Sequence, residues 1–371
     1  MPSATCRMGH RAPVWLSLSF IISICGVFCN GAVPIDPRLQ APWVASIFKK
    51  NSANNQWEYI CGGTITSANT VITSARCVLP RISKNEKLSS RPYHYNYAEL
   101  QVVAGLKSIN LDAKDQFTQI GQVGQIRDLF AFTDNPDTPY KDLAALRLKN
   151  QFNLSTPYVK DVLLTQFGQT ILEANATKPG DTVMLAGFER IDPNSVGVQT
   201  RSKTNQTLQV RQVVLTDIGA CINRYLSSYD AFYFDVLCAK GASEKDVVPC
   251  RFEGAGMITQ GMFDPKAKNS KVEFYLMGVY SSNTALSKSE GTIKAKNQVK
   301  PEDCTANDVI FFTKLGYLER WGISHDFCGH DLAMCLNNKC RPWENLCDGT
   351  PQCDDKSDET QQMCHNQKPK K

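Results

Sequence analysis

The 371-residue chain lacks several features that mark particular classes of protein. Beyond residue 31 it has no apolar stretch long enough to cross a bilayer. It has no basic stripe with interleaved aromatic residues, and its net charge of +5 is small for this length, so nucleic acid is not an expected partner. The Lys-rich stretch 288–300 and the tail 365–371 are interpreted as solvated segments, with binding to a polyanion or a charged surface as the alternative.

The chain also lacks internal repeats and, before residue 313, any long amphipathic helix. A hydrophobic content of 42% indicates a globular protein, and short strand-like segments separated by Gly, Pro, Asn and Asp predict a mainly β fold, either barrel or sandwich. One exception is 313–323, where apolar residues recur at helical spacing and predict a packed terminal helix. The clearest predicted strands are QVVAGL (101–106), TVMLAGF (182–188), LQVRQVVL (208–215) and FYLMGVY (274–280).

The N-terminus has the pattern of a secretory signal peptide. Arg7 and Arg11 precede the uncharged stretch Val14–Cys29, and small residues follow, so 1–31 is predicted to be a signal cleaved near 29–32. A membrane anchor is the alternative, but the stretch is short for a span and contains three serines. We therefore expect a secreted, extracellular protein without a membrane span.

The cysteines divide the rest of the chain into two parts. Three of the 15 leave with the signal, which leaves twelve, an even number that predicts six disulfides in an oxidising compartment. Six are spread between Cys61 and Cys304, and six crowd between Cys328 and Cys364. The first domain is expected at 32–323, followed by a linker at 324–327. In the second domain, 328–364, bridges must replace a hydrophobic core.

Several segments, taken in order, resemble the chymotrypsin-like serine proteases of the trypsin family. The resemblance covers 41–323 and implies two six-stranded antiparallel β-barrels with a cleft between them. It also implies the disulfides Cys61–Cys77, Cys221–Cys238 and Cys250–Cys304. The segments are APWVASI (41–47), CGGTITSANTVITSARC (61–77), DLAALRL (142–148), VMLAGF (183–188), CINRY (221–225), VLCAKG (236–241), PCRFEGAGM (249–257) and FFTKLGYLERW (311–321).

The catalytic positions implied by this resemblance are altered. Arg76 stands in place of the histidine, Asp142 keeps the aspartate, and Gly254 stands in place of the serine. The reaction needs an oxygen nucleophile and a base that titrates near neutral pH. Glycine offers no nucleophile, and arginine stays protonated. We expect an inactive homologue in which Arg76 makes a bidentate ion pair with Asp142. The alternative is that both side chains point to solvent.

The positions that would bind substrate have changed as well. Phe252 stands where a glycine N–H would stabilise an oxyanion, and Val248 and Ile310 fall at the floor and wall of the primary specificity pocket. Ser282 and Asn283 replace the Trp-Gly edge of that pocket. We expect the pocket to be filled.

The segment 328–364 resembles a low-density-lipoprotein receptor class A module. This resemblance implies the pairs Cys328–Cys340, Cys335–Cys353 and Cys347–Cys364, and one Ca²⁺ held by oxygen ligands. The implied ligands are the side chains of Asp348, Asp358 and Glu359, the carbonyls of Asn345 and Thr350, and Gln352 in place of an aspartate. A neutral ligand at 352 predicts lower affinity. The alternative is that the acidic run is only a solvated face.

Three sequons occur in this expected extracellular chain, so at least one N-linked glycan is expected. They begin at Asn153, Asn175 and Asn205.

Two classes of function follow from these patterns. The first is a secreted non-catalytic protease homologue acting as cofactor, scaffold or decoy in an extracellular proteolytic cascade, with proteases or their substrates as partners. An inactive homologue of this family with an accessory module is similar to proteins of arthropod innate immunity that act in melanisation or complement-like responses. The second is a Ca²⁺-dependent adhesion or ligand-binding protein, and a residual hydrolase is a more distant third.

Overall fold

A computed structural model of the chain describes most of both barrels and parts of the C-terminal region. Contacts divide the chain into Met1–Asp36 and Pro37–Lys371, and the architecture below belongs to the second unit. No helix among the described residues is long and apolar enough to cross a membrane. The described residues are 35–78, 95–128, 142–164, 178–189, 207–217, 219, 221, 236–243, 249, 251–262, 272–283, 308–315, 332–334, 340–342, 348–354 and 356–359.

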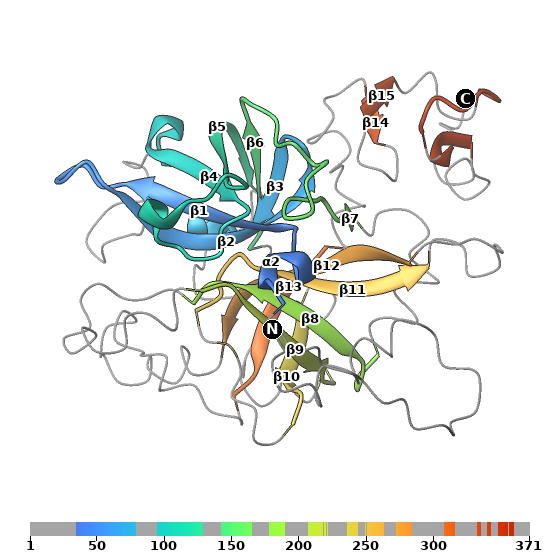
Figure 1. Cartoon of the computed structure of the whole chain (residues 1–371). Helices are drawn as coiled ribbons and strands as arrows, with labels where there is room; N and C mark the ends of the chain where they lie inside the picture. The colour runs from blue at the N-terminus through green and yellow to red at the C-terminus, as the bar shows by residue number, and fades with distance from the viewer. Residues whose placement is uncertain are drawn as a thin grey trace, which may run out of the picture. The chain divides into compact units, whose positions relative to one another are not determined.

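Six antiparallel strands close into a first barrel in the order β1-β2-β3-β6-β5-β4 (Figure 1). Pairing of β1 with β4 completes the ring and leaves no free strand edge. The short helix α2 (Pro37–Gln40) precedes the barrel. The strands are β1 (Val44–Lys50), β2 (Trp57–Ser67), β3 (Thr70–Thr73), β4 (Leu100–Ala104), β5 (Gln119–Asp128) and β6 (Ala144–Leu148).

Strand β1 shows why this barrel lies against a second layer. Successive side chains of a strand point to opposite faces. Ala45 and Ile47 pack in the interior of the first barrel, whereas Val44 and Phe48 belong to a cluster that also contains residues of the second barrel. An amphipathic strand would leave one of these faces in water. Here both faces are apolar, because one fills the barrel and the other seals the junction.

Six further strands close into a second barrel in the order β11-β8-β9-β10-β13-β12, through pairing of β11 with β12. The prediction of two six-stranded antiparallel barrels is therefore confirmed. The additional strand β7 (Leu163–Leu164) runs parallel to β12. The barrel strands are β8 (Thr182–Gly187), β9 (Gln209–Leu215), β10 (Val236–Gly241), β11 (Gly256–Met262), β12 (Val272–Asn283) and β13 (Ile310–Lys314).

The expected helix at 313–323 is wrong at its start. Thr313 and Lys314 belong to β13, which pairs with both β10 and β12. The two neighbouring strands offer hydrogen-bond partners to the backbone of this segment, and tertiary context of this kind overrides a local helical pattern. Residues 316–323 lie outside the described residues.

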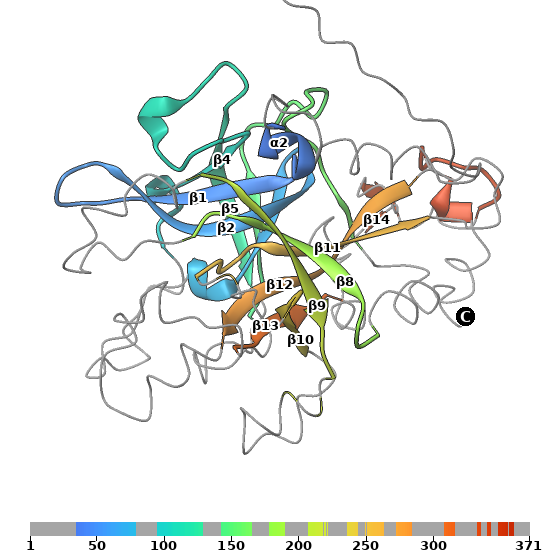
Figure 2. The same cartoon turned by 60° about the horizontal axis from the view of Figure 1, so that its bottom comes forward.

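Apolar side chains of both barrels meet in a shared cluster. Trp43, just before β1, contacts Phe274 of β12 with ring centroids 4.7 Å apart. The backbone N–H of Gly62 on β2 donates to the carbonyl of Glu253, in the loop before β11, at 2.9 Å. Figure 2 shows β1 and β2 lying over β11 and β8 at this junction. The junction is thus held by apolar burial and by main-chain hydrogen bonds.

Four short 3₁₀ turns and a small ribbon complete the described elements. The ribbon pairs β14 (Leu332–Met334) with β15 (Cys340–Pro342). The turns are η1 (Ala75–Cys77), η3 (Tyr97–Glu99), η4 (Leu111–Ala113) and η10 (Ser357–Glu359).

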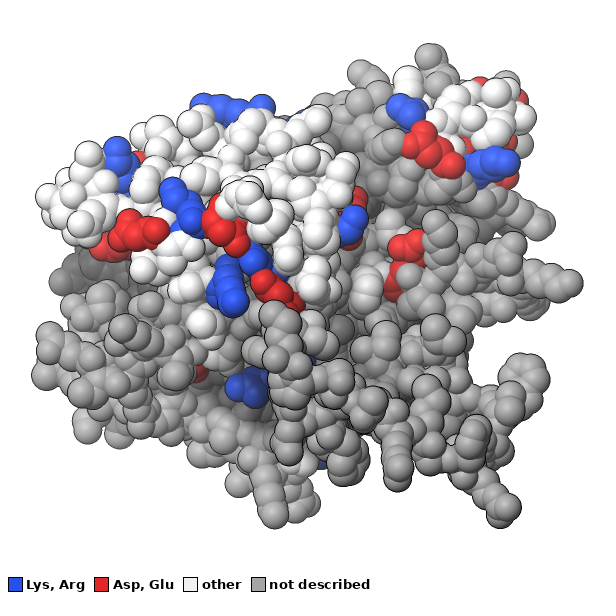
Figure 3. Space-filling model, in the orientation of Figure 1, with Lys and Arg blue, Asp and Glu red and all other residues white. Residues whose placement is uncertain are grey.

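Described charges on the face seen in Figure 3 are mixed in sign. Basic and acidic side chains lie next to one another and do not gather by sign. Within the described part of that face, no extended field of one sign is presented to a charged partner.

Candidate functional site

Arg76 is held at the barrel junction by the short turn η1. This turn follows β3, and its backbone closes with the N–H of Cys77 donating to the carbonyl of Ser74 at 3.0 Å. A disulfide joins Cys77 to Cys61 on β2, across a separation of 16 residues. The turn and the disulfide together leave the Arg76 backbone little freedom.

Asp142 lies two residues before strand β6 and has no exposed surface. One of its carboxylate oxygens, Oδ1, accepts the backbone N–H of Arg76 at 3.0 Å, and the other, Oδ2, accepts Nε of Arg76 at 2.5 Å. Of the bidentate pair that was expected, the structure describes one guanidinium contact, from Nε to Oδ2, and it places the backbone N–H of Arg76 on Oδ1. A buried carboxylate without such partners would be costly.

Ser281 extends this network into the second barrel. Its hydroxyl, on β12, donates to Oδ2 of Asp142 at 2.6 Å and accepts from Nη2 of Arg76 at 2.9 Å. Thr313 on β13 donates to the carbonyl of Asp142 at 3.3 Å. Residues from both barrels therefore share one buried charge, while the Arg76 side chain remains 22% exposed.

Gly254 lies where the two barrels touch, and no side chain fits there. Its φ of +82° is in the left-handed region, and a Cβ on it would lie 2.2 Å from the carbonyl oxygen of Gly62 and 2.3 Å from Oγ1 of Thr73. The Thr73 hydroxyl donates to that same carbonyl at 2.8 Å, and the N–H of Gly254 donates to the carbonyl of Tyr280 at 2.9 Å. Both steric contact and backbone conformation favour glycine at this position.

The residues around Gly254 belong to the interior of the second barrel. Phe252 is 1% exposed and packs with Tyr280, Ile310 and Phe312. Ser282 is also buried. Phe252, predicted at the oxyanion position, and Ile310, predicted at the wall of the specificity pocket, are both core side chains. Val248 and the side chain of Asn283 lie outside the described residues.

This arrangement offers little for acid–base or nucleophilic chemistry. The hydroxyls of Thr73 and Ser281 are fully buried and already donate to oxygen acceptors. Arg76 can donate hydrogen bonds but cannot accept a proton. None of the five histidines lies among the described residues. At this junction, the described side chains form a structural network.

Comparison with known families settles what the two barrels are. The trypsin family matches residues 30–251, more than half of the chain. The chain belongs to the trypsin family.

Two curated relatives are similar to this trypsin-family chain. Phenoloxidase-activating factor 1 from Holotrichia diomphalia is 24% identical over 256 residues, covering 65% of this chain and 59% of that protein. CLIP domain-containing serine protease B9 from Anopheles gambiae is 24% identical over 242 residues, covering 65% of this chain and 53% of the relative. The chain thus spans little more than half the length of either relative.

Two participants in the junction of this trypsin-family chain were missed by sequence reasoning. Ser281 is one of several serines and carries no motif that distinguishes it. Thr73 opens the segment TSARC (73–77), but its contact with position 254 joins the end of β3 to the loop before β11, which is far away in sequence. Only their proximity in space gives these hydroxyls a role.

Five of the six residues predicted to bind Ca²⁺ lie in the described part of the C-terminal loop, where hydrogen bonds join them to one another. Glu359 accepts the backbone N–H groups of Asp348 and Gly349 at 3.0 and 2.9 Å. Gln352 donates its side-chain amide to Asp348 at 2.9 Å and its backbone N–H to Asp358 at 2.6 Å. Exposed Thr350 donates its N–H to Asp348, and Asn345 lies outside the described residues.

Two of the expected disulfides are present, Cys61–Cys77 and Cys221–Cys238. Cys353 is disulfide-bonded, but its predicted partner Cys335 lies outside the described residues. Each of the other expected bridges has at least one cysteine outside the described residues: Cys250–Cys304, Cys328–Cys340 and Cys347–Cys364.

Among the sequons, the structure describes only Asn153. It is exposed, and its side-chain oxygen accepts the N–H of Ser155 at 3.0 Å. Asn175 and Asn205 lie outside the described residues.

We expect substitution of Gly254 to destabilise the protein without creating activity. Gly254→Ser and Gly254→Ala should each cost at least about 2–3 kcal/mol of unfolding free energy, because the overlap begins at Cβ and adds to the strain of a positive φ. Urea denaturation measures this. Gly180→Ala is the matched control, since Gly180 has a φ of +97° and a Cβ on it would have no atom within 4 Å. Equal losses at 180 and 254 would contradict the steric argument.

We expect Arg76 and Asp142 to be strongly coupled. Arg76→Ala should cost about 3–5 kcal/mol, because it leaves a buried carboxylate without its cation. Adding Asp142→Asn should recover part of that loss, so a double-mutant cycle should give a coupling of about 1–3 kcal/mol. Arg147→Ala removes an exposed arginine from β6 and should change stability by less than about 0.5 kcal/mol. Additive effects at 76 and 142 would refute the coupling.

Proposed function

We propose that this trypsin-family chain is a secreted, non-catalytic protease homologue that acts as a cofactor, scaffold or decoy in an extracellular proteolytic cascade. The observation that carries the proposal is the closed junction at Gly254. A nucleophile cannot be attached there without overlap with Gly62 and Thr73. The residue beside the retained Asp142 is an arginine that neutralises it. The family's scaffold remains, while its reacting groups are replaced by packing and charge pairing.

The names of the two relatives support a role in a cascade. One is called a phenoloxidase-activating factor and the other a serine protease. A non-catalytic relative of such proteins could bind either a protease or its substrate through a surface that the fold retains. We place this homologue in an innate immune response, of the melanisation or complement-like kind, and expect it outside the cell with a glycan at exposed Asn153.

Recovery from the culture medium and a probe assay test this proposal together. The full chain, secreted by cultured insect cells through its own N-terminus, should take up no fluorophosphonate and hydrolyse no peptide or ester. Added to a purified cascade protease and its zymogen substrate, it should change the rate of zymogen conversion several-fold. An active trypsin-family protease is the positive control for labelling.

Stoichiometric labelling of any serine would overturn the non-catalytic assignment. An unchanged conversion rate at saturating concentrations of the chain, together with no binding to either cascade component, would overturn the role as cofactor, scaffold or decoy.

The C-terminal loop favours a second candidate, a Ca²⁺-dependent binding module. The side-chain oxygen of Gln352 is buried and has no hydrogen-bond partner, and Asp358 has no exposed surface. An orphaned oxygen in the same loop as three acidic side chains suits a hard cation. Within the described residues no three His, Cys, Asp or Glu side chains are grouped for a metal. A bound Ca²⁺ would supply the charge that draws Asp348, Asp358 and Glu359 toward the Gln352 oxygen.

We expect Ca²⁺ to protect the loop 348–359 from hydrogen exchange and to leave the barrels unchanged. Gln352→Asp should tighten binding by roughly tenfold in calorimetric titration, because it adds a charged ligand. Asp354→Asn removes a carboxylate that is 58% exposed and outside the predicted ligand set, so it should leave affinity unchanged. Identical exchange with Ca²⁺ and with chelator would exclude the site.

A further inference from the structure

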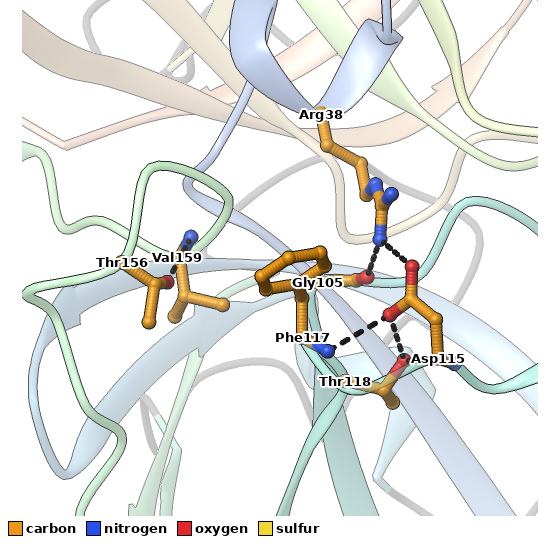
Figure 4. A network of polar contacts seen from close by, with 7 residues as sticks. All are labelled: Arg38, Gly105, Asp115, Phe117, Thr118, Thr156 and Val159. Carbon is orange, nitrogen blue, oxygen red and sulfur yellow. Dashed lines mark hydrogen bonds and ion pairs between the residues drawn. The ribbon is translucent and has the colours of Figure 1, made fainter.

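Among the arginines that the structure describes, Arg38 of α2 is the most completely buried. It is 5% exposed although it lies in a four-residue helix at the start of the folded unit. Its Nη1 donates to the carbonyl of Gly105 at 3.0 Å and to Oδ2 of Asp115 at 2.6 Å (Figure 4). The guanidinium carbon lies 4.4 Å from the ring centroid of Tyr158 and 5.9 Å from that of Phe117.

These four partners form a preorganised cage, which we call the Arg38 cage: Gly105, Asp115, Phe117 and Tyr158. Oδ1 of Asp115 accepts the N–H of Phe117 at 3.0 Å and the hydroxyl of Thr118 at 3.3 Å, so the carboxylate is fixed from both sides. The two rings pack with centroids 4.5 Å apart. Gly105 has a φ of +72°, and a Cβ on it would lie 2.6 Å from the carbonyl oxygen of Phe117. A planar guanidinium suits this combination of carboxylate, carbonyl and aromatic faces.

The charge of the cage complements its occupant. Burial raises the pKa of Asp115, but the hydrogen bond from Arg38, the N–H of Phe117 and the positive charge of Arg38 outweigh it. The pKa of Asp115 therefore lies below its ordinary value of 3.8. The carboxylate is ionised at neutral pH, and its contribution to stability is lost only as the pH falls through this lowered pKa.

The cage also lies where the barrels meet. Helix α2 contacts β9 of the second barrel, and Ala41, which follows α2, belongs to the shared apolar cluster. The loop that supplies Gly105 continues to Lys107, whose carbonyl accepts the N–H of Leu208 at 2.9 Å, directly before β9. Withdrawing Arg38 would therefore loosen a segment that touches both barrels.

The position of Arg38 has a consequence for proteolysis. A trypsin-like protease must place an arginine or lysine side chain in its own specificity pocket before it cuts the following bond. Leu39, on the far side of that bond, is 48% exposed, whereas the Arg38 side chain is held inside the cage. The scissile bond is thus near the surface, but the side chain that would direct cleavage is withheld.

We propose that Arg38–Leu39 is a gated cleavage site for arginine-specific proteases, and that the Arg38 cage is its gate. When the cage opens, such a protease adds water across the peptide bond, leaving a carboxylate on Arg38 and an amine on Leu39. The product begins five residues before β1 starts at Val44, so the barrel strands remain intact. The inference does not depend on the proposed non-catalytic role.

Limited digestion of the native full chain by trypsin tests the gate. The rate at which fragments beginning at Leu39 appear is measured by mass spectrometry and divided by the rate of cleavage after Lys149, an exposed residue that follows β6. Asp115→Ala should raise this ratio by roughly tenfold or more, because cleavage follows the population of the open form. Arg38→Lys keeps a cleavable residue but loses the guanidinium fork, and should raise it in the same direction.

Asp112→Ala is the matched control, because Asp112 is an exposed aspartate of the same loop that lies outside the cage. It should leave the ratio unchanged. If Asp115→Ala fails to fold, Arg38→Lys still tests the proposal. Melting curves show whether each variant is folded. Rapid cleavage after Arg38 in the wild type, or an unchanged ratio in the folded cage variants, would overturn the proposal. Equal acceleration at Arg38 and Lys149 would mean general loosening and would overturn it too.

Discussion

A carboxylate with no exposed surface lies at the centre of the barrel junction, and it must be neutralised for the chain to fold. Asp142 meets this requirement through Arg76, whose turn is tied to β2 by a disulfide, and through Ser281 of the other barrel. Removing a buried charge from water is compensated only when its partners are fixed in place. The ion pair itself lies within the first barrel, and the hydrogen bonds of Ser281 and Thr313 tie the same buried charge to the second barrel.

Two other close contacts differ from this one in their chemistry. At Gly254 the backbone of one barrel approaches the other so closely that a single added carbon would overlap with it. At α2 a guanidinium is enclosed by a carboxylate and two rings. An active enzyme must keep reactive groups accessible and incompletely satisfied at such a junction, often at a cost in stability. Here the polar groups around Asp142 are paired, which favours a rigid joint.

Sequence patterns predicted the β architecture well, because alternation and turn residues act over short distances. They failed at Thr313 and Lys314, where helical spacing was outweighed by hydrogen bonds from β10 and β12. For the junction, the resemblance to the trypsin family placed Arg76 beside Asp142, and their opposite charges then predicted the pair. The hydrogen bond of Ser281 and the contact of Thr73 with position 254 could not be predicted, because each joins segments that no local pattern connects.

The sequence by itself determined which chemistry each side chain could perform. Glycine has no nucleophile, arginine cannot act as a base near neutral pH, and short apolar strands must close on themselves to satisfy their backbones. Only the tertiary structure decided that position 254 excludes a Cβ, that Ser281 shares the Asp142 charge, and that Arg38 is enclosed by residues 67 and 77 positions away. These features depend on distances of a few ångströms between parts of the chain that only folding brings together.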